Sequence, residues 1–485
     1  MFKLHSLRFS CRVALLACLV GSPTFADVKP HALFSDGVVL QRGRKVAIWG
    51  SAADGEKVSV DFQGKKAAAT TKGGKWKVVL DDLTVGGPYE MTIAGKNEIK
   101  LKEVYVGEVW VCSGQSNMTL ALTSCGAEAQ KTIAASENKL LRLYTVPMTA
   151  AETPQENIGT LPGTAILPVW MGCSPMSVTY FSATAYFFGC ALQKALGVPV
   201  GLIHASVGGT QAETWMRRDV LDGIPEIKPT LGRYAIGYPS SFYNGMIAPL
   251  LPFAMRGVIW YQGESNGAGA YVYRTLFPAL IKNWRDDWKQ GDFPFLYVQL
   301  APYDPGAPAG GPKGISFAEI RDSQFYVNSK KIPKVAMAVI TDTVPTSLAT
   351  DIHPTNKEPV GQRLALAARA LAYGEKIVYS GPIYESMKVE GGKIRLTFNS
   401  IGAGLVADGG GLMGFTIAGA DRQFVAAKAE IQDKCVIVSA AGVAAPVAVR
   451  YGWANCPEGN LCNAEKLPAS PFRTDDFQLT TQPAK

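Results

Sequence analysis

The chain has 485 residues, of which 47% are hydrophobic and 18% charged, and a net charge of +8 at pH 7. This length predicts about two to four domains, and the composition indicates a globular protein with a large core. The basic residues are scattered and are not interleaved with aromatic residues, so no nucleic acid is expected as a partner. No segment after residue 26 contains 18 uninterrupted apolar residues, so no membrane span is expected.

Residues 1–26 have the pattern of a secretory signal peptide, and we expect the protein to be secreted or periplasmic. The positive region contains three basic residues, Lys3, Arg8 and Arg12. Residues 13–20 form an apolar core, and residues 24–26 supply a small-x-small cleavage site. A lipoprotein anchored at Cys18 is the alternative, but the apolar core continues past that cysteine.

The cysteines predict neither a metal site nor a unique disulfide framework. Seven cysteines follow the signal segment, and Cys456 and Cys462 flank a short stretch that a disulfide can close. Cys112 lies in an apolar run and is expected to be a buried thiol. The chain has no Cys-x-x-Cys pair and only four histidines, so no zinc site and no cofactor are expected.

Residues 27–103 are predicted to form an N-terminal domain resembling a β-sandwich. Short β-rich stretches alternate there with turn signals such as Asp54-Gly55 and Gly73-Gly74. The expected strands cover residues 38–41, 45–50, 57–62 and 75–80. No chemistry is evident in this part of the chain.

Residues 104–375 alternate predicted strands and helices, which indicates a parallel sheet flanked by helices on both faces. The expected strands cover residues 104–112, 141–146, 200–205, 257–261, 295–300 and 335–340. The expected helices include residues 181–196, with Ser182 as N-cap, and residues 360–369. Ligands of such sheets bind beyond the carboxyl ends of the strands. Residues 376–485 return to β structure and are expected to form a C-terminal β-rich domain.

The most informative segment is the strand 104–112 and the sequence Ser113-Gly114-Gln115-Ser116-Asn117 that follows it. Ser116 comes where a strand turns into the next element, so its hydroxyl can be exposed beside outward-pointing backbone N–H groups. A serine nucleophile for acyl transfer requires this arrangement. The alternative is an ordinary polar turn between a strand and a helix.

Histidine is the usual base for such a serine, and the chain offers few candidates. His353 lies in the polar loop Thr350-Asp351-Ile352-His353-Pro354, where Asp351 can orient it. His204 lies in an apolar strand and is expected to be a hydrogen-bonded core residue. His31 is expected to be structural.

Four ordered blocks resemble the sialate O-acetylesterase branch of the SGNH/GDSL hydrolases, which has acetylxylan esterase relatives. The blocks are Gly114-Gln115-Ser116-Asn117-Met118, Gly208-Gly209-Thr210, residues 260–266 (WYQGESN) and Asp351-Ile352-His353-Pro354. The resemblance extends to residues 243–250 and 470–473 and covers nearly all of the chain after residue 26. It implies an α/β fold with an SGNH-type sheet and a secreted carbohydrate O-acetylesterase that acts through a serine acyl-enzyme.

The resemblance also implies site residues. Ser116 is the expected nucleophile, His353 the base, and the N–H groups of Ser116 and Gly209 are oxyanion donors, with Gly208 as the neighbouring alternative. Gln262 is the expected third donor, where many SGNH relatives have Asn. Arg321 is a candidate substrate-binding residue, with a structural ion pair as the alternative.

Two expectations concern carboxylates. Glu264 is the other polar residue near Gln262, but an ionised carboxylate cannot donate to an oxyanion, so Glu264 is expected to brace its loop instead. Asn266 and Asn117 are also expected to hold loops. The widespread SGNH pattern places Asp three residues before His, where this chain has Thr350. The orienter of His353 is therefore Asp351, another group such as Asp342, or a backbone carbonyl.

Two other functions compete with the acetylesterase. One is a carbohydrate-binding protein that has lost activity, which the retained Ser116 and His353 argue against. The other is a lipase-like esterase for longer acyl chains. The sequence identifies neither the acetylated sugar, which is sialic acid or a plant-type glycan such as xylan, nor the oligomeric state.

Overall fold

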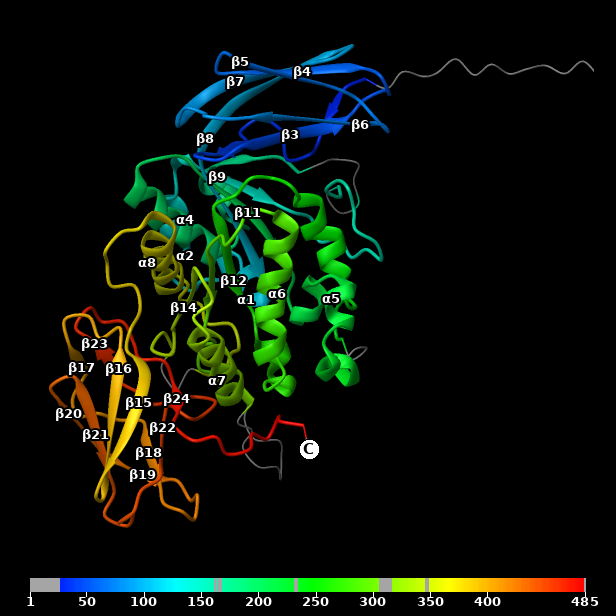
Figure 1. Ribbon diagram of the computed structural model, residues 1–485. Helices are drawn as coiled ribbons and strands as arrows, with labels where there is room; N and C mark the ends of the chain where they lie inside the picture. The colour runs from blue at the N-terminus through cyan, green and yellow to red at the C-terminus, as the bar shows by residue number, and fades with distance from the viewer. Residues whose placement is uncertain are drawn as a thin grey trace, which may run out of the picture.

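The computed structural model describes residues 27–160, 163, 168–230, 234–304, 316–344 and 349–483. The predicted signal peptide, residues 1–26, lies outside the described residues. Figure 1 shows three parts in a row, with β strands at each end and a central part built of strands and helices. The structure is thus mixed α/β, as the sequence predicts.

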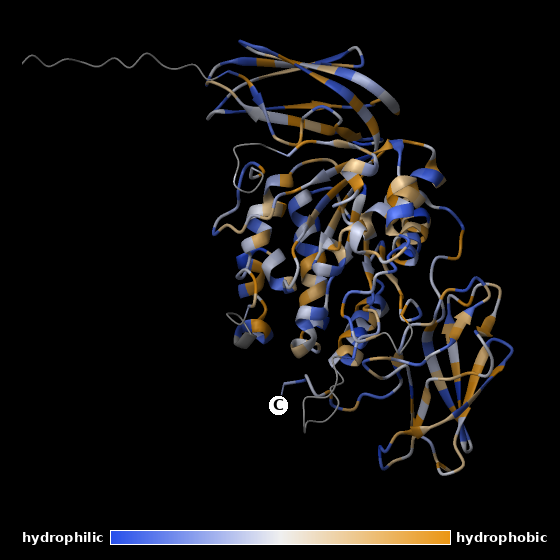
Figure 2. Ribbon diagram, turned by 180° about the vertical axis from the view of Figure 1, so that it is seen from behind, coloured by the Kyte–Doolittle hydropathy of each residue, from blue (hydrophilic) through white to orange (hydrophobic). Residues whose placement is uncertain are grey.

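The N-terminal strands form two layers. One layer contains β1 (Lys29–Pro30), β3 (Val46–Ser51) and β6 (Lys75–Leu80). The other contains β2 (Val39–Gln41), β4 (Lys57–Phe62), β5 (Lys65–Thr70), β7 (Gly86–Ala94) and the first half of β8 (Glu98–Gly114). Every second residue of β4 and β6 is buried, and Figure 2 shows hydrophobic and hydrophilic residues alternating along these strands. This period of two places one face of each sheet in a shared core.

Strand β8 connects this part to the central sheet. Its first half pairs with β7, and residues Glu108–Gly114 pair with β11. The predicted boundary between residues 103 and 104 therefore falls inside one continuous strand. The chain enters the central sheet without a linker.

The central sheet has the order β10-β9-β11-β8-β12-β13-β14. Its further strands are β9 (Asn138–Thr145), β10 (Met171–Cys173), β11 (Val200–Ser206), β12 (Gly257–Tyr261), β13 (Phe295–Val298) and β14 (Val335–Ala338). All neighbours along this order are parallel except β10, which is antiparallel to β9. The chain passes from β8 to one side of the sheet and then crosses to β12. The carboxyl end of β8 therefore lies at a switch point, where such sheets bind ligands.

Helices cover both faces of this sheet. On the face of Trp110, the indole contacts Phe188 of α4 (Ala183–Leu196) and donates to Tyr373 of α8 (Glu358–Tyr373). Trp260 is paired with Ser113 of β8, which points to the opposite face from Trp110 because side chains alternate along a strand. Trp260 therefore lies on that opposite face, where it packs on Trp284 of α6 (Tyr273–Trp288). Ser182 caps α4 as predicted, accepting from the N–H of Ala185 at 3.1 Å.

The remaining helical segments are α7 (Ser316–Ser329), which lies beside α6, and several shorter ones. The shorter ones are α1 (Ser116–Thr119), α2 (Ala129–Ala134), α3 (Pro175–Val178), α5 (Arg218–Asp222), η1 (Leu122–Ser124), η2 (Ala212–Trp215), η3 (Pro225–Thr230), η4 (Tyr243–Ile247), η5 (Ala248–Leu250) and η6 (Glu264–Gly269). Of these, α1 and η6 start directly after strand ends on either side of the switch point. They position polar residues at the carboxyl edge of the sheet.

The C-terminal strands enclose a second hydrophobic core, which includes Ile394, Leu396, Val436 and Phe472. One sheet contains β15 (Ile383–Glu390), β16 (Lys393–Asn399), β21 (Cys435–Ser439) and β20 (Lys428–Gln432). The second contains β19 (Val425–Ala426), β18 (Phe415–Ala418), β22 (Ala448–Tyr451) and β24 (Phe472–Arg473), and a pair contains β17 (Leu405–Ala407) and β23 (Leu461–Asn463).

The cysteines differ in part from expectation. No disulfide joins Cys456 to Cys462 in the structure. Cys112 is fully buried in β8 as predicted, and burial raises the pKa of its thiol. Cys462 lies in β23, with its Sγ 3.6 Å from the carbonyl oxygen of Val406. The C-terminal part is therefore held by its core and strand pairing in this structure.

Candidate active site

Ser116 lies at the carboxyl end of β8, immediately after a turn that requires glycine. Gly114 has φ +139°, and a Cβ added there would lie 2.1 Å from the carbonyl oxygen of Tyr261. The next residue, Gln115, donates its backbone N–H to that same carbonyl at 2.9 Å. Ser116 then begins α1 and is partly exposed. The turn therefore presents Ser116 at the sheet edge, as the sequence predicts.

The predicted oxyanion donors lie beside this serine. A Cβ added to Gly208 would be 3.4 Å from Cβ of Ser116, so the loop after β11 lies against the turn that carries Ser116. Gly209 adopts φ +73°, a left-handed conformation that favours glycine. The N–H groups of Ser116 and Gly209 have no acceptor among the described residues. Both groups are thus available to an oxygen that develops negative charge.

Gln262 follows β12, but its side chain is fully buried and its amide is already hydrogen-bonded. Its Nε2 donates to the carbonyl oxygen of Thr210 at 3.2 Å and to Oδ1 of Asn266 at 2.6 Å, and its Oε1 accepts from the hydroxyl of Tyr273 at 2.9 Å. Both amide protons are therefore committed. The sequence predicts Gln262 as the third oxyanion donor, but in the structure its side chain holds the loop after β11, which contains Gly209.

His353 lies in the loop between β14 and α8, with its side chain 36% exposed. Asp351 accepts the backbone N–H of His353 at 2.8 Å, and its Oδ1 is 3.5 Å from Nδ1 of the imidazole. Asp342, the alternative orienter, is held by both terminal nitrogens of Arg363 at 2.6 Å each. Of the two carboxylates, Asp351 is the one in contact with the histidine.

The side chain of Asn117 joins the serine turn to the histidine loop. Its Nδ2 donates to the carbonyl oxygen of Ile352 at 2.9 Å and to Oε1 of Glu264 at 2.6 Å. The structure thereby confirms the loop-bracing roles predicted for Asn117 and Glu264. The residue after Ser116 and the residue before His353 are hydrogen-bonded to each other across 235 positions of sequence.

Lys357 is a member of this cluster that the sequence did not reveal. Its side chain is 1% exposed, its Nζ donates to Oδ1 of Asn117, and it lies 5.2 Å from the ring centre of Tyr261. Burial lowers the pKa of Lys357 to about 8 and raises the pKa of Glu264. A lysine near the start of a helix is ordinarily solvated, so the sequence pattern gave no reason to place it here.

Arg321 does not contact a site that a substrate can reach. Its guanidinium is fully buried and donates to the carbonyl oxygens of Leu300 at 3.0 Å and Ala454 at 2.7 Å, and also to Ala301 and Asn455. The predicted substrate-binding role is corrected accordingly: Arg321 ties α7 and the loop after β13 to the C-terminal part. Its described partners are carbonyl groups, so the alternative of an ion pair does not hold either.

The other histidines have the structural roles predicted for them. His204 is buried, its Nε2 is 2.6 Å from the hydroxyl of Ser206, and its ring packs on Phe181. His31 is buried against Trp49, with ring centres 4.9 Å apart. Burial lowers the pKa of both imidazoles to about 4. Neither is therefore suited to act as a base for Ser116.

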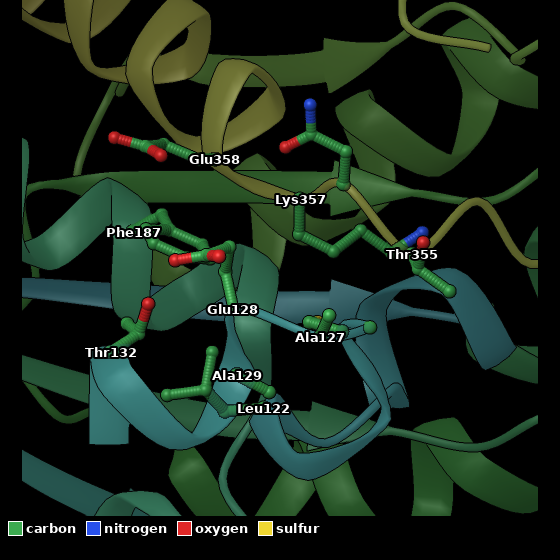
Figure 3. A pocket seen from close by; sticks show the side chains of 12 residues that line it. Leu122, Ala127, Glu128, Ala129, Thr132, Phe187, Thr355, Lys357 and Glu358 are labelled. Carbon is green, nitrogen blue, oxygen red and sulfur yellow. The ribbon is translucent and has the colours of Figure 1, made fainter. Parts of the chain in front are cut away.

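A pocket of about 360 Å³ lies next to the cluster. Its lining includes residues that follow Ser116 and His353 in the chain, with Leu122 and Cys125 after α1 and Thr355 and Lys357 after His353. In Figure 3 the carboxylates of Glu128 and Glu358 lie on one side of this pocket and the Lys357 side chain on another. Lys357 therefore both lines this pocket and donates to the amide of Asn117.

Metal-binding clusters and membrane-spanning helices are both absent from the part of the chain that the structure describes. The described residues contain no group of three or more His, Cys, Asp or Glu side chains arranged to hold a metal ion. No helix among them has the length and apolar character needed to cross a membrane.

Comparisons with known proteins match both the central part and most of the chain. A family model described as carbohydrate esterase, sialic acid-specific acetylesterase, matches residues 106–370. The sialate O-acetylesterase of Mus musculus is 31% identical over 421 residues, covering 75% of this chain and 77% of the mouse protein. That of Homo sapiens is 32% identical over 397 residues, covering 75% of each. The crystal structure of a carbohydrate acetylesterase from Xanthomonas citri superimposes with a TM-score of 0.85 at 40% identity, covering 93% of this chain and 100% of the other.

Proposed function

This chain belongs to the carbohydrate esterase family of sialic acid-specific acetylesterases, and we propose that it removes acetyl groups from carbohydrates through an acyl intermediate on Ser116. The observation that carries the mechanism is the position of Ser116 at the end of β8, tied through Asn117 to the loop of His353. A nucleophile, a base and unpaired backbone donors are the parts that acyl transfer requires.

In the first half of the reaction, Oγ of Ser116 attacks the acetyl carbonyl carbon while His353 takes the hydroxyl proton. The N–H groups of Ser116 and Gly209 donate to the oxyanion that forms. The C–O bond to the sugar then breaks, and His353 returns its proton to the departing sugar oxygen. Asp351, 3.5 Å from the imidazole, stabilises the imidazolium formed during this step.

In the second half, water attacks the acetyl-serine and His353 accepts its proton. The tetrahedral intermediate collapses, acetate leaves, and the proton passes to Oγ of Ser116. The residues of this chain supply the whole sequence of proton transfers. Gln262 contributes indirectly, because it holds the loop in which Gly209 lies.

The test is acetate release from O-acetylated sialic acid, acetylated xylan and acetylated xyloglucan, with Ser116→Ala as the matched control. We expect release from at least one acetylated glycan and a loss of roughly 10³-fold or more in kcat for the variant. p-Nitrophenyl acetate should be cleaved faster than the palmitate ester. Preference for palmitate would favour a lipase-like esterase, and glycan binding without acetate release would favour an inactive binding protein.

The proposal includes export from the cytoplasm, which the pattern of residues 1–26 supports. The full chain expressed in a bacterium should yield an exported protein that begins at Asp27. An intact N-terminus on cytoplasmic protein would contradict this part of the proposal.

A further inference from the structure

The amide of Asn117 lies between a buried cation and a buried carboxylate. Nζ of Lys357 donates to its Oδ1, and its Nδ2 donates to Oε1 of Glu264 at 2.6 Å. Asn117 and Lys357 are each 1% exposed. These hydrogen bonds are charge-assisted and are shielded from water, which makes them stronger than bonds between neutral groups.

The two charges determine which way the amide faces. An ammonium only donates and an ionised carboxylate only accepts, so Oδ1 must face Lys357 and one Nδ2 proton must face Glu264. The second Nδ2 proton then points to the carbonyl oxygen of Ile352, 2.9 Å away. A reversed amide would place like groups against each other on both sides and would lose the bond to the histidine loop.

We propose that Lys357 and Glu264 are positioning residues for ester hydrolysis: by orienting Asn117, they hold the loop of His353 in register with Ser116. This inference rests on the proposed serine mechanism. The two side chains act on the geometry of the nucleophile and base, so their loss lowers kcat with little effect on KM. A misplacement of about 1 Å between reacting groups costs about 100-fold in rate.

The charge on Lys357 gives the arrangement a measurable signature. Burial lowers its pKa to about 8, while Glu264, Cys125 and Asp351 raise it, and the face of Tyr261 is 5.2 Å away. Above that pH the amine is neutral and its bond to Asn117 is no longer charge-assisted. The wild-type enzyme should therefore lose kcat as the pH rises through about 8.

The experiment compares kcat, KM and pH profiles for acetyl ester hydrolysis by the wild type, four test variants and one control variant. The number of active sites is counted with a fluorophosphonate that labels the nucleophilic serine. Lys357→Met should lower kcat per active site by about 10- to 100-fold, change KM by less than about 3-fold, and lose the fall in kcat near pH 8. Asn117→Asp, which removes both donors, should lower kcat by about 100-fold, and it serves as the second variant if Lys357→Met does not fold.

Position 264 supplies a matched pair. Glu264→Gln keeps an oxygen that accepts from Asn117, so at a pH where Lys357 is still protonated kcat should stay within about 3-fold of wild type. The fall in kcat should move to a pH below that of the wild type, because the carboxylate that raises the pKa of Lys357 is gone. Glu264→Leu removes the acceptor as well and should lose kcat as Lys357→Met does.

The control is a buried cation at the opposite end of the sheet. Arg285 of α6 donates to the carbonyl oxygens of Phe293 at 2.8 Å and Pro333 at 2.7 Å, before β13 and β14 begin. Arg285→Met should lower stability and leave kcat per active site and its pH profile unchanged. Wild-type kcat and pH profile in both Lys357→Met and Asn117→Asp would overturn the inference. Failure of the serine mechanism itself is distinguishable, because Ser116→Ala would then remain active.

Discussion

The side chain of Asn117 donates a 2.9 Å hydrogen bond to the backbone carbonyl of Ile352. This bond joins the neighbour of the proposed nucleophile to the neighbour of the proposed base, which the chain otherwise separates by an entire α/β part. The proposed nucleophile and base are therefore connected through the side chain of Asn117, which has no role in the proposed proton transfers. The same bond explains how a partly exposed loop can hold a base in place.

The first prediction concerns the histidines. His353→Ala should lower kcat nearly as far as Ser116→Ala, by roughly 10³-fold or more, because the pair acts as a unit. The double variant should be little worse than either single variant. Kinetics with p-nitrophenyl acetate measure all three, and losses that multiply in the double variant would contradict the assignment.

The second prediction separates the two carboxylates near the histidine loop. Asp351→Asn should lower kcat by about 10- to 100-fold with little change in KM, because the carboxylate next to Nδ1 stabilises the imidazolium. Asp342→Asn should lower the melting temperature by breaking the pair with Arg363, and it should leave kcat nearly unchanged. Wild-type turnover in Asp351→Asn would indicate a Ser–His dyad or another orienter of His353, such as a backbone carbonyl.

The third prediction concerns Gln262. Because both of its amide protons are committed to Thr210 and Asn266, Gln262→Glu should destabilise the fold and lower kcat per labelled active site by less than about 10-fold. Loss of a true oxyanion donor costs about 100- to 1000-fold. A loss of that size in folded enzyme would return Gln262 to the oxyanion hole.

The fourth prediction concerns the size of the acyl group. Cδ1 of Ile236 lies 3.0 Å from where a Cβ on Gly209 would be, and Ile236 is 42% exposed. We therefore expect Ile236 to limit the space beside the oxyanion donors. Ile236→Ala should raise kcat/KM for butyryl relative to acetyl esters by about 10-fold, whereas Tyr238→Phe in the same segment should not. An unchanged ratio in Ile236→Ala would exclude this role.

The fifth prediction concerns acid stability. Burial lowers the pKa of His204 to about 4, whereas an unfolded chain protonates histidine at about 6.5. Between these values the unfolded state binds more protons, so the free energy of unfolding should fall as the pH drops from about 6.5 to about 4. His31 acts in the same direction.

The measurement is thermal unfolding between pH 7 and pH 4 for wild type and His204→Gln. The glutamine keeps a polar partner for Ser206 but does not titrate, so the variant should lose less stability over this range. Equal pH dependence of the two proteins would show that His204 does not carry the effect.

The sequence by itself determined the features that depend on local pattern. Apolar runs that end in Gly-Gln-Ser and Gly-Gly predicted strands with turns at their carboxyl ends. Parallel strands bring such ends to one edge of a sheet. The local pattern was therefore enough to place Ser116 and Gly209 together. The cap at Ser182 and the core role of His204 followed from equally local signals.

Only the tertiary structure decided which polar side chains are buried and what they bind. Gln262 and Arg321 each lie in a motif that suggests a hydrogen-bond donor to the substrate. In the structure, however, carbonyl groups from segments distant in the chain accept their hydrogen bonds. Lys357 lies 240 positions from Asn117 and carries no local signal at all. Its burial and its partner arise where α8 meets the turn after β8. A side chain's desolvation and hydrogen-bond partners are set by the packed neighbours that folding brings to it.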